Sequence, residues 1–388
     1  MQEDFHYYAT YCAALLAGYT PAESSEIAYS AQFVDLCTRT LLEKIKGPVQ
    51  AATTQSQLEL ADAKTDIPGL QDITRIWSSF HFLPGDLYVK KKWRGRRYMQ
   101  RYRLICNPDS DLIVETVQLA KGKGPQAAGL AMHILADTWA HRYFAGTPSF
   151  VINNATSFYE LKGESSSDDD TRIIFRHNPT ARDAPETNYY TNTIYQNDER
   201  SIMNLGHGRA GHLPDYSFMR YRYLPAWGDY EIIIKDNPRD YWHAFCQMVY
   251  AMKYLRGERD SFEKKHYEEE NLEMWKSDIM RILEKRQLLA SDDWKVFGFG
   301  LSGVSLEDFN IEKYQAEYVA AASDEKYSTF LGRFFLAALA QKSMVTNRIF
   351  MSRNRLAGFS VNYDKRGLKG IRDYWKLVEM RKRGDGNG

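Results

Sequence analysis

Residues 133–141 read His133-Ile134-Leu135-Ala136-Asp137-Thr138-Trp139-Ala140-His141. This stretch lies in an apolar run that begins at Pro125 and ends near Phe144, just before Gly146 and Pro148. Proline at the start and glycine and proline at the end are typical helix boundaries. The sequence therefore predicts a long apolar helix over about 125–144.

Three polar side chains of this helix share one face. His133, Asp137 and His141 are four residues apart, and four residues advance an α-helix by about 400°. Burying three such groups without partners would be costly, and imidazole and carboxylate are ligands of zinc and similar metals. A hydrogen-bonded His–Asp network in a helical core is the alternative, and we favour a metal.

Further candidate ligands are distributed along the first 216 residues. Asp35 stands among small and apolar residues, and His81 lies in an apolar stretch before a turn. Between positions 206 and 215, glycines that allow close backbone approach accompany two histidines and an acid. The alternative for His6 is a surface histidine that follows a helix-capping Asp4. The alternative for 206–215 is a flexible loop capped by Asp215. The candidates beyond the apolar helix are His6, Asp35, His81, His207, His212 and Asp215.

Composition sets the broad class of protein. The chain has 388 residues, a formal net charge of +1, 44% hydrophobic and 26% charged residues. These are ordinary globular values, which exclude wholesale disorder, and the near-zero charge argues against a nucleic-acid coat protein. We expect a cytoplasmic chain with reduced cysteines, because the four cysteines are far apart and neither a signal peptide nor an apolar run of 18 residues is present. Export by a route without a signal peptide stays open.

The remaining patterns predict a mainly α fold. Thr20-Pro21-Ala22-Glu23 is a helix-opening sequence, whereas 50–75 is weakly patterned and 160–200 reads as loop. The predicted helices are 4–17, 20–46, 125–144, 241–255, 262–288, 306–322, 327–349 and 371–378, with 112–120 as helix or strand. We expect a catalytic domain over 1–255 and a C-terminal helical extension over 256–388 packed on it.

A basic β-hairpin is predicted over about 87–105. It carries eight Lys and Arg residues between Lys90 and Arg103, interleaved with Trp93, Tyr98 and Tyr102. Such a segment can contact anionic lipid headgroups or a nucleic-acid backbone. A solvated edge hairpin protected from pairing by its charges fits equally well.

Taken in chain order, these candidates resemble the zinc-dependent phospholipase C and single-strand nuclease superfamily of helical enzymes. The resemblance covers roughly residues 4–216, and it is strongest to an uncharacterised bacterial family with a similar Asp-Phe-His-Tyr-Tyr opening. It implies a multi-helix fold of the zinc phospholipase C type with two or three Zn²⁺ ions. One metal would be held by Asp35, His81, His133 and Asp137, a second by His141, His212 (or His207) and Asp215, and a third by His6 with Asp137 as a bridge.

Two departures from the family are visible. The family uses the amine of a mature N-terminal Trp, whereas here Met1 precedes Gln2, so we expect that ligand to be missing and Asp4 to substitute for it. His212 and Asp215 are three residues apart across a proline, whereas the family has four on a helix. A site with two metals therefore stays open.

The resemblance implies a phosphodiester hydrolase acting on phospholipid or nucleic acid. Paired zinc ions polarise a phosphoryl oxygen and lower the pKa of a bridging water towards ~7, and Asp35 and Asp137 would be the catalytic acids, with Asp35 accepting the water proton. The chain has no His-Glu-x-x-His, which excludes the common metalloprotease helix. The alternatives are a non-catalytic metal- or phosphate-binding protein, and a toxin or effector acting on lipid or nucleic acid. The sequence does not fix the oligomeric state.

Overall fold

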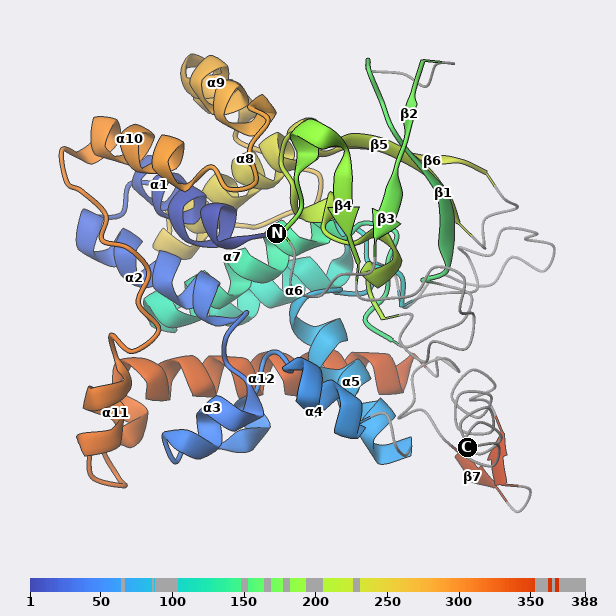
Figure 1. The fold of residues 1–388 in the computed structure, drawn as a ribbon. Coiled ribbons are helices and arrows are strands. Elements are labelled where there is room, and N and C mark those ends of the chain that lie inside the picture. Colours follow the sequence, from blue (N-terminus) through green and yellow to red (C-terminus); the bar gives the residue numbers. More distant parts are fainter. Residues whose placement is uncertain are drawn as a thin grey trace.

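A computed structural model of the chain describes residues 1–63, 67–85, 87, 104–147, 153–163, 169–176, 182–192, 205–225, 231–352, 362–364 and 367–369. The described chain is mainly helical and carries a small sheet. The N-terminus lies near the middle of the molecule, between helices and strands (Figure 1).

Helix α7 (Gly124–Ala140) forms the centre of the helical part, and almost every one of its residues is buried. Helices from distant parts of the chain pack against it: α2 (Pro21–Phe33), α6 (Asp111–Ala120), α8 (Asn237–Arg256) and α12 (Phe330–Met351). The contact with α2 is tight because Gly129 has no side chain. A Cβ there would lie 2.1 Å from the carbonyl oxygen of Ile27.

The N-terminal segment runs beside α7. It is a π-helix, η1 (Asp4–Ala9), that continues into α1 (Thr10–Leu16). The next helix, α2, begins with the expected capping box, in which Thr20 accepts from the Glu23 backbone and the Glu23 carboxylate accepts from Thr20. The predicted helix 20–46 is interrupted. The chain turns after Phe33 and restarts at α3 (Arg39–Lys44), which Thr38 caps.

A second layer of helices lies beneath α7 in Figure 1, with α12 as its longest member. It includes α4 (Gln57–Ala63) and α5 (Ile67–Phe80). Helix α4 lies within the weakly patterned stretch 50–75, and α5 begins in it and continues beyond it. The buried side chains of α12, among them Phe334 and Val345, share one hydrophobic core with residues near the N-terminus such as Phe5. Helix α11 (Gln315–Ala320) lies in the same layer, whereas α9 (Glu269–Glu284) and α10 (Ser291–Ser302) lie above α7 in Figure 1.

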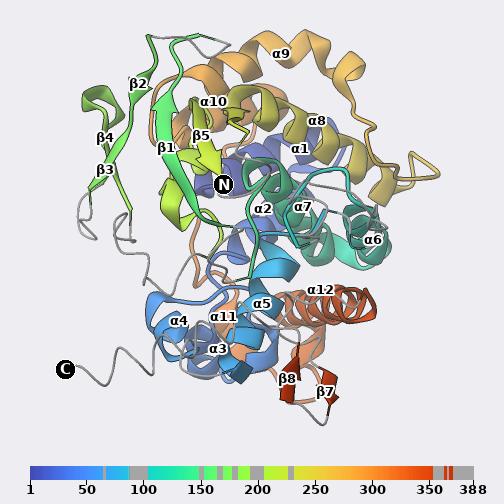
Figure 2. The same ribbon diagram turned by 90° about the vertical axis from the view of Figure 1, so that its right-hand side faces the viewer.

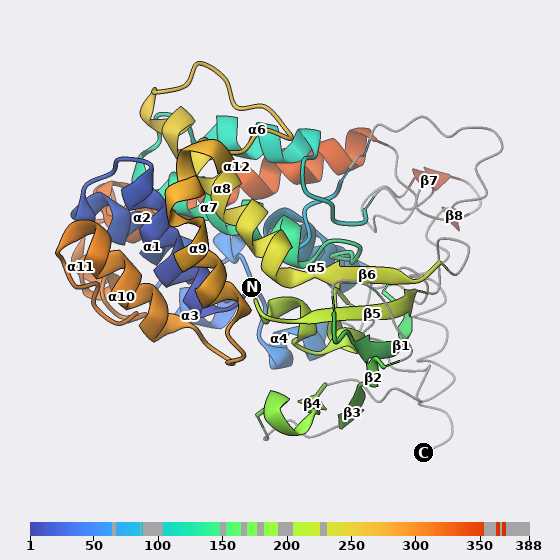
Figure 3. The ribbon, with the colours of Figure 1, turned by 90° about the horizontal axis from the view of Figure 1, so that it is seen from above.

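The strands lie along one side of the helical body (Figures 2 and 3). A four-stranded antiparallel sheet has the order β2-β1-β5-β6. Alternate residues of β5 are buried, and they pack into a second hydrophobic cluster around Phe158 and Tyr223. Two further pairs, parallel β3-β4 and antiparallel β7-β8, are smaller. The bounds are β1 (Ala155–Glu160), β2 (Thr171–Arg172), β3 (Ile174–Arg176), β4 (Tyr189–Thr191), β5 (Arg220–Pro225), β6 (Ile233–Asp236), β7 (Asn362–Asp364) and β8 (Gly367–Lys369).

The prediction of a mainly α chain with a small β element is confirmed, but the details differ. Strands occupy part of 160–200, which was expected to be loop. Helices α9 and α11 are shorter than the predicted helices 262–288 and 306–322, and α10 was not predicted. The hairpin 87–105 falls almost entirely outside the described residues, and the helix 371–378 falls wholly outside them. Among the described helices, none is long and apolar enough to cross a membrane.

Candidate metal centre

Five separate segments bring the predicted ligands together. His6 comes from η1, Asp35 from the turn after α2, and His81 from the residue that follows α5. His133 and Asp137 lie on α7, and His141 is its C-terminal cap. Two short 3-10 turns, η5 (Gly208–Ala210) and η6 (Leu213–Asp215), frame the loop of His207 and Asp215. The resulting cluster adjoins a cavity of about 530 Å³.

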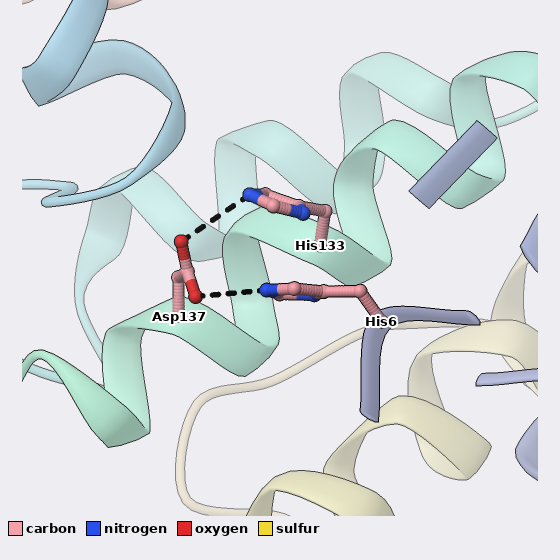
Figure 4. A group of neighbouring side chains, drawn as sticks. All are labelled: His6, His133 and Asp137. Atoms are coloured by element: carbon pink, nitrogen blue, oxygen red, sulfur yellow. Dashed lines mark ion pairs between the residues drawn. The ribbon is translucent and has the colours of Figure 1, made fainter. Parts of the chain in front are cut away.

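Asp137 is the central acid of the cluster and is buried. Its Oδ1 lies 3.2 Å from Nε2 of His6, and its Oδ2 lies 3.2 Å from Nε2 of His133. Figure 4 shows the carboxylate facing both rings, one from η1 and one from α7. The two imidazoles stack with ring centroids 3.8 Å apart. Both histidine side chains are fully buried, so the three groups form one closed set.

His81 and Asp35 extend this set towards the cavity. Nδ1 of His81 lies 3.2 Å from Oδ2 of Asp137 and 3.3 Å from Nε2 of His133. Oδ1 of Asp35 lies 3.7 Å from Nδ1 of His81 and 3.8 Å from Nε2 of His133. The Asp35 side chain is 30% exposed, whereas that of Asp137 is 1% exposed. Of the two acids, Asp35 is therefore the one open to solvent.

A second set forms around Asp215. Its Oδ1 lies 3.2 Å from Nε2 of His141, and its Oδ2 lies 3.6 Å from Nε2 of His207. Gly211, at φ +54°, supports this loop, because a Cβ there would lie 2.5 Å from the carbonyl oxygen of Thr191. The two sets are joined through His141, whose Nδ1 is 3.5 Å from Oδ2 of Asp137.

Hydrogen bonds to carbonyl groups fix the tautomers of three imidazoles, since a carbonyl can only accept. His81 donates through Nε2 to Thr53 at 3.0 Å, His141 through Nδ1 to His81 at 2.8 Å, and His207 through Nδ1 to Gly211 at 2.7 Å. The second nitrogen of each ring is then the one available to a metal. Nδ1 of His81 faces Asp137; burial would lower the pKa of His81, but Asp137 and Asp35 raise it. Nε2 of His207 faces Asp215, and burial lowers the pKa of His207 to about 4, so a lone pair meets a carboxylate oxygen there at pH 7. A cation between them resolves this mismatch, and carbonyl-anchored histidines are typical of metal sites.

The other two histidines have unsatisfied nitrogens. Neither ring nitrogen of His6 and not Nδ1 of His133 has a hydrogen-bond partner of good geometry among the described residues. Burial lowers the pKa of His6, His133 and His207 to about 4, so these rings are neutral at pH 7. Neutral imidazole is the form that binds metals.

The acids of the cluster differ in charge state. Burial would raise the pKa of Asp137 and Asp215, but the histidines and the Met1 amine around them hold both pKa values well below the ordinary range. Burial and the neighbouring Asp137 raise the pKa of Asp35, against the opposing effect of His6 and His81. Asp137 and Asp215 are thus permanent anions at neutral pH, and Asp35 is the more basic carboxylate.

The ligand atoms form three sets, each within 4.8 Å: His6, His133 and Asp137; Asp35, His81 and His133; His141, His207 and Asp215. Nitrogen and oxygen donors in groups of three match zinc sites that keep one position open. His133 belongs to two sets, so the donors suit two or three ions. The residues present therefore fit the metal ions that the sequence suggested.

Two predicted ligands lie apart from these sets. Asp4 accepts hydrogen bonds from the backbone amides of Phe5 and Ala290, both at 2.9 Å, and thus joins η1 to the start of α10. His212 contacts Asp215 through Nδ1 at 3.5 Å, but its side chain is 59% exposed, against 18% for His207. The structure therefore favours His207 over His212 as the third donor.

The α-amino group of Met1 also lies in the cluster. Its nitrogen is buried, 2.8 Å from Oδ1 of Asp137, 3.2 Å from Oδ1 of Asp215 and 3.3 Å from Nε2 of His141. Burial would lower the pKa of this group, but Asp137, Asp215 and Asp35 outweigh burial and raise it to about 11. The amine therefore contacts acids and a histidine of the cluster, whereas Asp4 contacts backbone amides.

The cavity wall adds groups that the sequence pattern did not reveal. Arg182 is the only Arg or Lys among the described residues that line the cavity, and its side chain is exposed. The adjacent Asp183 is buried and anchored to the Thr191 backbone at 2.6 Å and the Tyr216 hydroxyl at 2.8 Å. An isolated arginine in a polar segment gives no sequence signal, so only the fold shows its position.

Comparison with known proteins identifies the family of the chain. Comparison with curated proteins finds no match, and comparison with solved structures finds none either. A single family model matches residues 1–349, which include every residue of the cluster and α12 except its last two residues. The chain therefore belongs to a family of unknown function, DUF6765.

Proposed function

We propose that this protein is a zinc-dependent hydrolase that cleaves phosphodiester bonds. The observation that carries the proposal is the convergence of buried imidazole nitrogens and carboxylate oxygens around Asp137 and Asp215. Neutral imidazoles and carboxylates so close together are the donors that a zinc ion requires. The resemblance to zinc phospholipases C and single-strand nucleases supports the same conclusion.

The three donor sets would hold the metal. Bound zinc would supply a Lewis acid and a nucleophilic water at neutral pH. Each set contributes at least three protein atoms. A purely structural zinc site would be closed by four protein ligands and shielded from substrate. The cluster instead lines a cavity, with Asp35 partly exposed there, which favours catalysis over the alternative of a non-catalytic metal protein.

The two central acids would have different roles. Asp137 is almost completely buried and holds a permanent charge, so it would bind metal rather than take up a proton. Asp35 lines the cavity, is partly exposed and has a raised pKa. Asp35 would therefore accept the proton of the attacking water.

The cavity wall fits an anionic substrate with an apolar part. Arg182 would bind a phosphate oxygen through its planar guanidinium. The apolar part of the wall comes from Trp77, Leu288 and Leu289, which also line the cavity. The half-exposed Leu289 would contact the substrate group attached to the phosphate. These features suit a phospholipid or the base of a nucleotide.

The first test is the metal content per chain, measured on protein purified without chelator or a polyhistidine tag. We expect two or three zinc ions per chain and metal-dependent hydrolysis of bis(p-nitrophenyl) phosphate. Phosphatidylcholine vesicles and single-stranded DNA then distinguish the two substrate classes. Asp137→Asn should reduce zinc affinity at least about 10-fold, the loss typical of disturbing even an indirect partner of a metal ligand.

Asp4→Asn is the matched control, because Asp4 is also a buried acid but contacts only backbone amides. It should keep its zinc. Protein that stays folded and takes up no zinc when zinc is added back would exclude the metal site. Zinc-loaded protein that cleaves none of the three substrates would leave a metal-binding protein and refute the hydrolase.

A further inference from the structure

A second cavity, of about 630 Å³, lies at the C-terminal end of α7. It is lined by Trp139 of α7 and by Arg142 just after that helix. The end of β6, the first turn of α8 and the loop at 265–267 complete the lining. Asp137 and His141 line the first cavity instead. The C-terminal end of α7 thus contributes to both cavities.

The acids in this second cavity already have partners. Asp240 pairs with the buried Lys235, which also donates to the Trp139 carbonyl at 2.9 Å. Asp236 accepts from Arg220 at 3.1 Å. Asp109 accepts from three neutral donors, the Gln247 amide at 2.8 Å, the Lys265 backbone at 2.9 Å and the Tyr267 hydroxyl at 2.6 Å. Of these three acids, Asp109 alone has no ion-pair partner among the described residues.

Three basic side chains of the cavity are less engaged. Nε of Arg142 is buried and has no hydrogen-bond partner among the described residues. Nη1 of Arg142 is 3.9 Å from Asp240, longer than a hydrogen bond. Arg239 and Lys265 are exposed, and no side-chain ion pair joins them to the described acids. Three basic side chains without a close ion pair therefore lie in a cavity with one such acid, Asp109. The buried Nε–H of Arg142 has no acceptor among the described residues.

We propose that this second cavity binds the phosphate group of a small molecule. Arg142 would donate its buried Nε–H to a phosphate oxygen, since guanidinium groups bind phosphate with several parallel hydrogen bonds. Arg239 and Lys265 would neutralise the remaining charge from the solvent side. The proposal is independent of the hydrolase, because none of these residues belongs to the metal sets.

Isothermal titration calorimetry with inorganic phosphate tests this proposal. The full chain is first treated with a chelator, so that metal ions in the first cavity cannot bind the phosphate. Wild-type protein should bind phosphate at millimolar concentration or below. Arg142→Gln should weaken binding roughly 10-fold or more, as expected for losing a hydrogen bond to a charged group. Arg239→Gln should weaken it less, because Arg239 is exposed.

Arg39→Gln is the matched control, since Arg39 is an exposed arginine on α3 that pairs with Glu43. It should bind phosphate like the wild type. Arg239→Gln also guards against misfolding of the Arg142 variant, because its exposed side chain makes no contact that folding requires. Equal phosphate affinity in wild type and in both cavity variants would overturn the proposal. Stronger binding of acetate than of phosphate would overturn the choice of phosphate over carboxylate.

Discussion

His141 donates a hydrogen bond from Nδ1 to the carbonyl oxygen of His81 at 2.8 Å. One predicted ligand thereby orients another through the backbone. The bond ties the C-terminal end of α7 to the residue that follows α5, and it turns Nε2 of His141 towards Asp215. The set that contains His81 and the set that contains His141 are thus joined by one hydrogen bond. A substitution in one set should therefore alter metal binding in the other.

His207 and His212 can be separated by metal content. His207→Gln should lose the metal of the Asp215 set, because Nε2 of His207 is a donor of that set. His212→Gln should keep every ion, because its side chain is mostly exposed and lies outside the three sets. Elemental analysis of both variants beside the wild type decides the question. Loss of an ion in His212→Gln alone would reverse the assignment.

The sequence predicted most of the cluster because its donors are rare, chemically distinctive residues. The four-residue spacing of His133, Asp137 and His141 determined one face of one helix. Spacing carried no information on long-range partners. Whether His207 or His212 joins the Asp215 set depends on a loop conformation with a left-handed glycine, Gly211. The position of Asp4 outside the donor sets was equally hidden, because the Ala290 amide that binds it lies 286 residues away.

The Met1 amine can be tested by extending the chain. A short uncleaved tag converts the amine into an amide and adds residues at a buried point of the cluster. We expect the tagged protein to lose affinity for zinc and to melt at a lower temperature than the untagged protein. The same tag at the C-terminus is the control and should change neither property. Equal zinc affinity with either tag would show that the amine makes no contribution.

Gly129 tests the packing that places α2 and its Asp35 turn against α7. Gly129→Ala puts a methyl group 2.1 Å from the Ile27 carbonyl, a backbone atom that cannot rotate away. We expect a loss of about 1–3 kcal/mol in the free energy of unfolding, as for other overpacked sites. Urea denaturation measures it.

Gly300→Ala is the matched control, because a Cβ at this helical position meets no atom within 4 Å. It should stabilise the protein by about 0.5–1 kcal/mol, the ordinary gain of alanine over glycine in a helix. A Gly129 variant as stable as the wild type would show that the two helices can move apart.

The fold was predictable where local signals were strong. The capping box at Thr20 and the apolar run of α7 gave correct helix starts. The break between α2 and α3 was missed, because the residues after Phe33 continue a helix-compatible pattern and tertiary contacts decide the turn. The strands around Phe158 and Tyr190 were missed because polar and loop-forming residues surround them in the sequence.

Arg182 provides a prediction about substrate binding. If Arg182 holds the phosphate group, Arg182→Ala should raise KM for an anionic phosphodiester by roughly 10-fold, since hydrogen bonds to charged groups contribute about 1.5–3 kcal/mol. Zinc content should not change, because the guanidinium lies outside the three donor sets. Steady-state kinetics and elemental analysis of the same sample provide both readouts. Arg172→Ala is the control, because that exposed arginine of β2 does not line the cavity.

His6 links metal binding to acid stability. In metal-free protein, the folded state keeps His6 neutral down to a pKa of about 4, whereas the unfolded chain takes up a proton near pH 6.5. The unfolded state binds more protons between these values, so His6 lowers the free energy of unfolding as pH falls from 6.5 to 4, by at most about 1.4 kcal/mol per pH unit.

His6→Met tests this effect, because methionine fills a similar volume and does not titrate. Urea denaturation in chelator at pH 7 and pH 5 should therefore show a smaller loss for His6→Met than for the wild type. The variant should also be more stable at both pH values, because it removes two unsatisfied buried nitrogens, and it should bind zinc less tightly. Equal acid sensitivity of the two proteins would mean that His6 is protonated in the folded state.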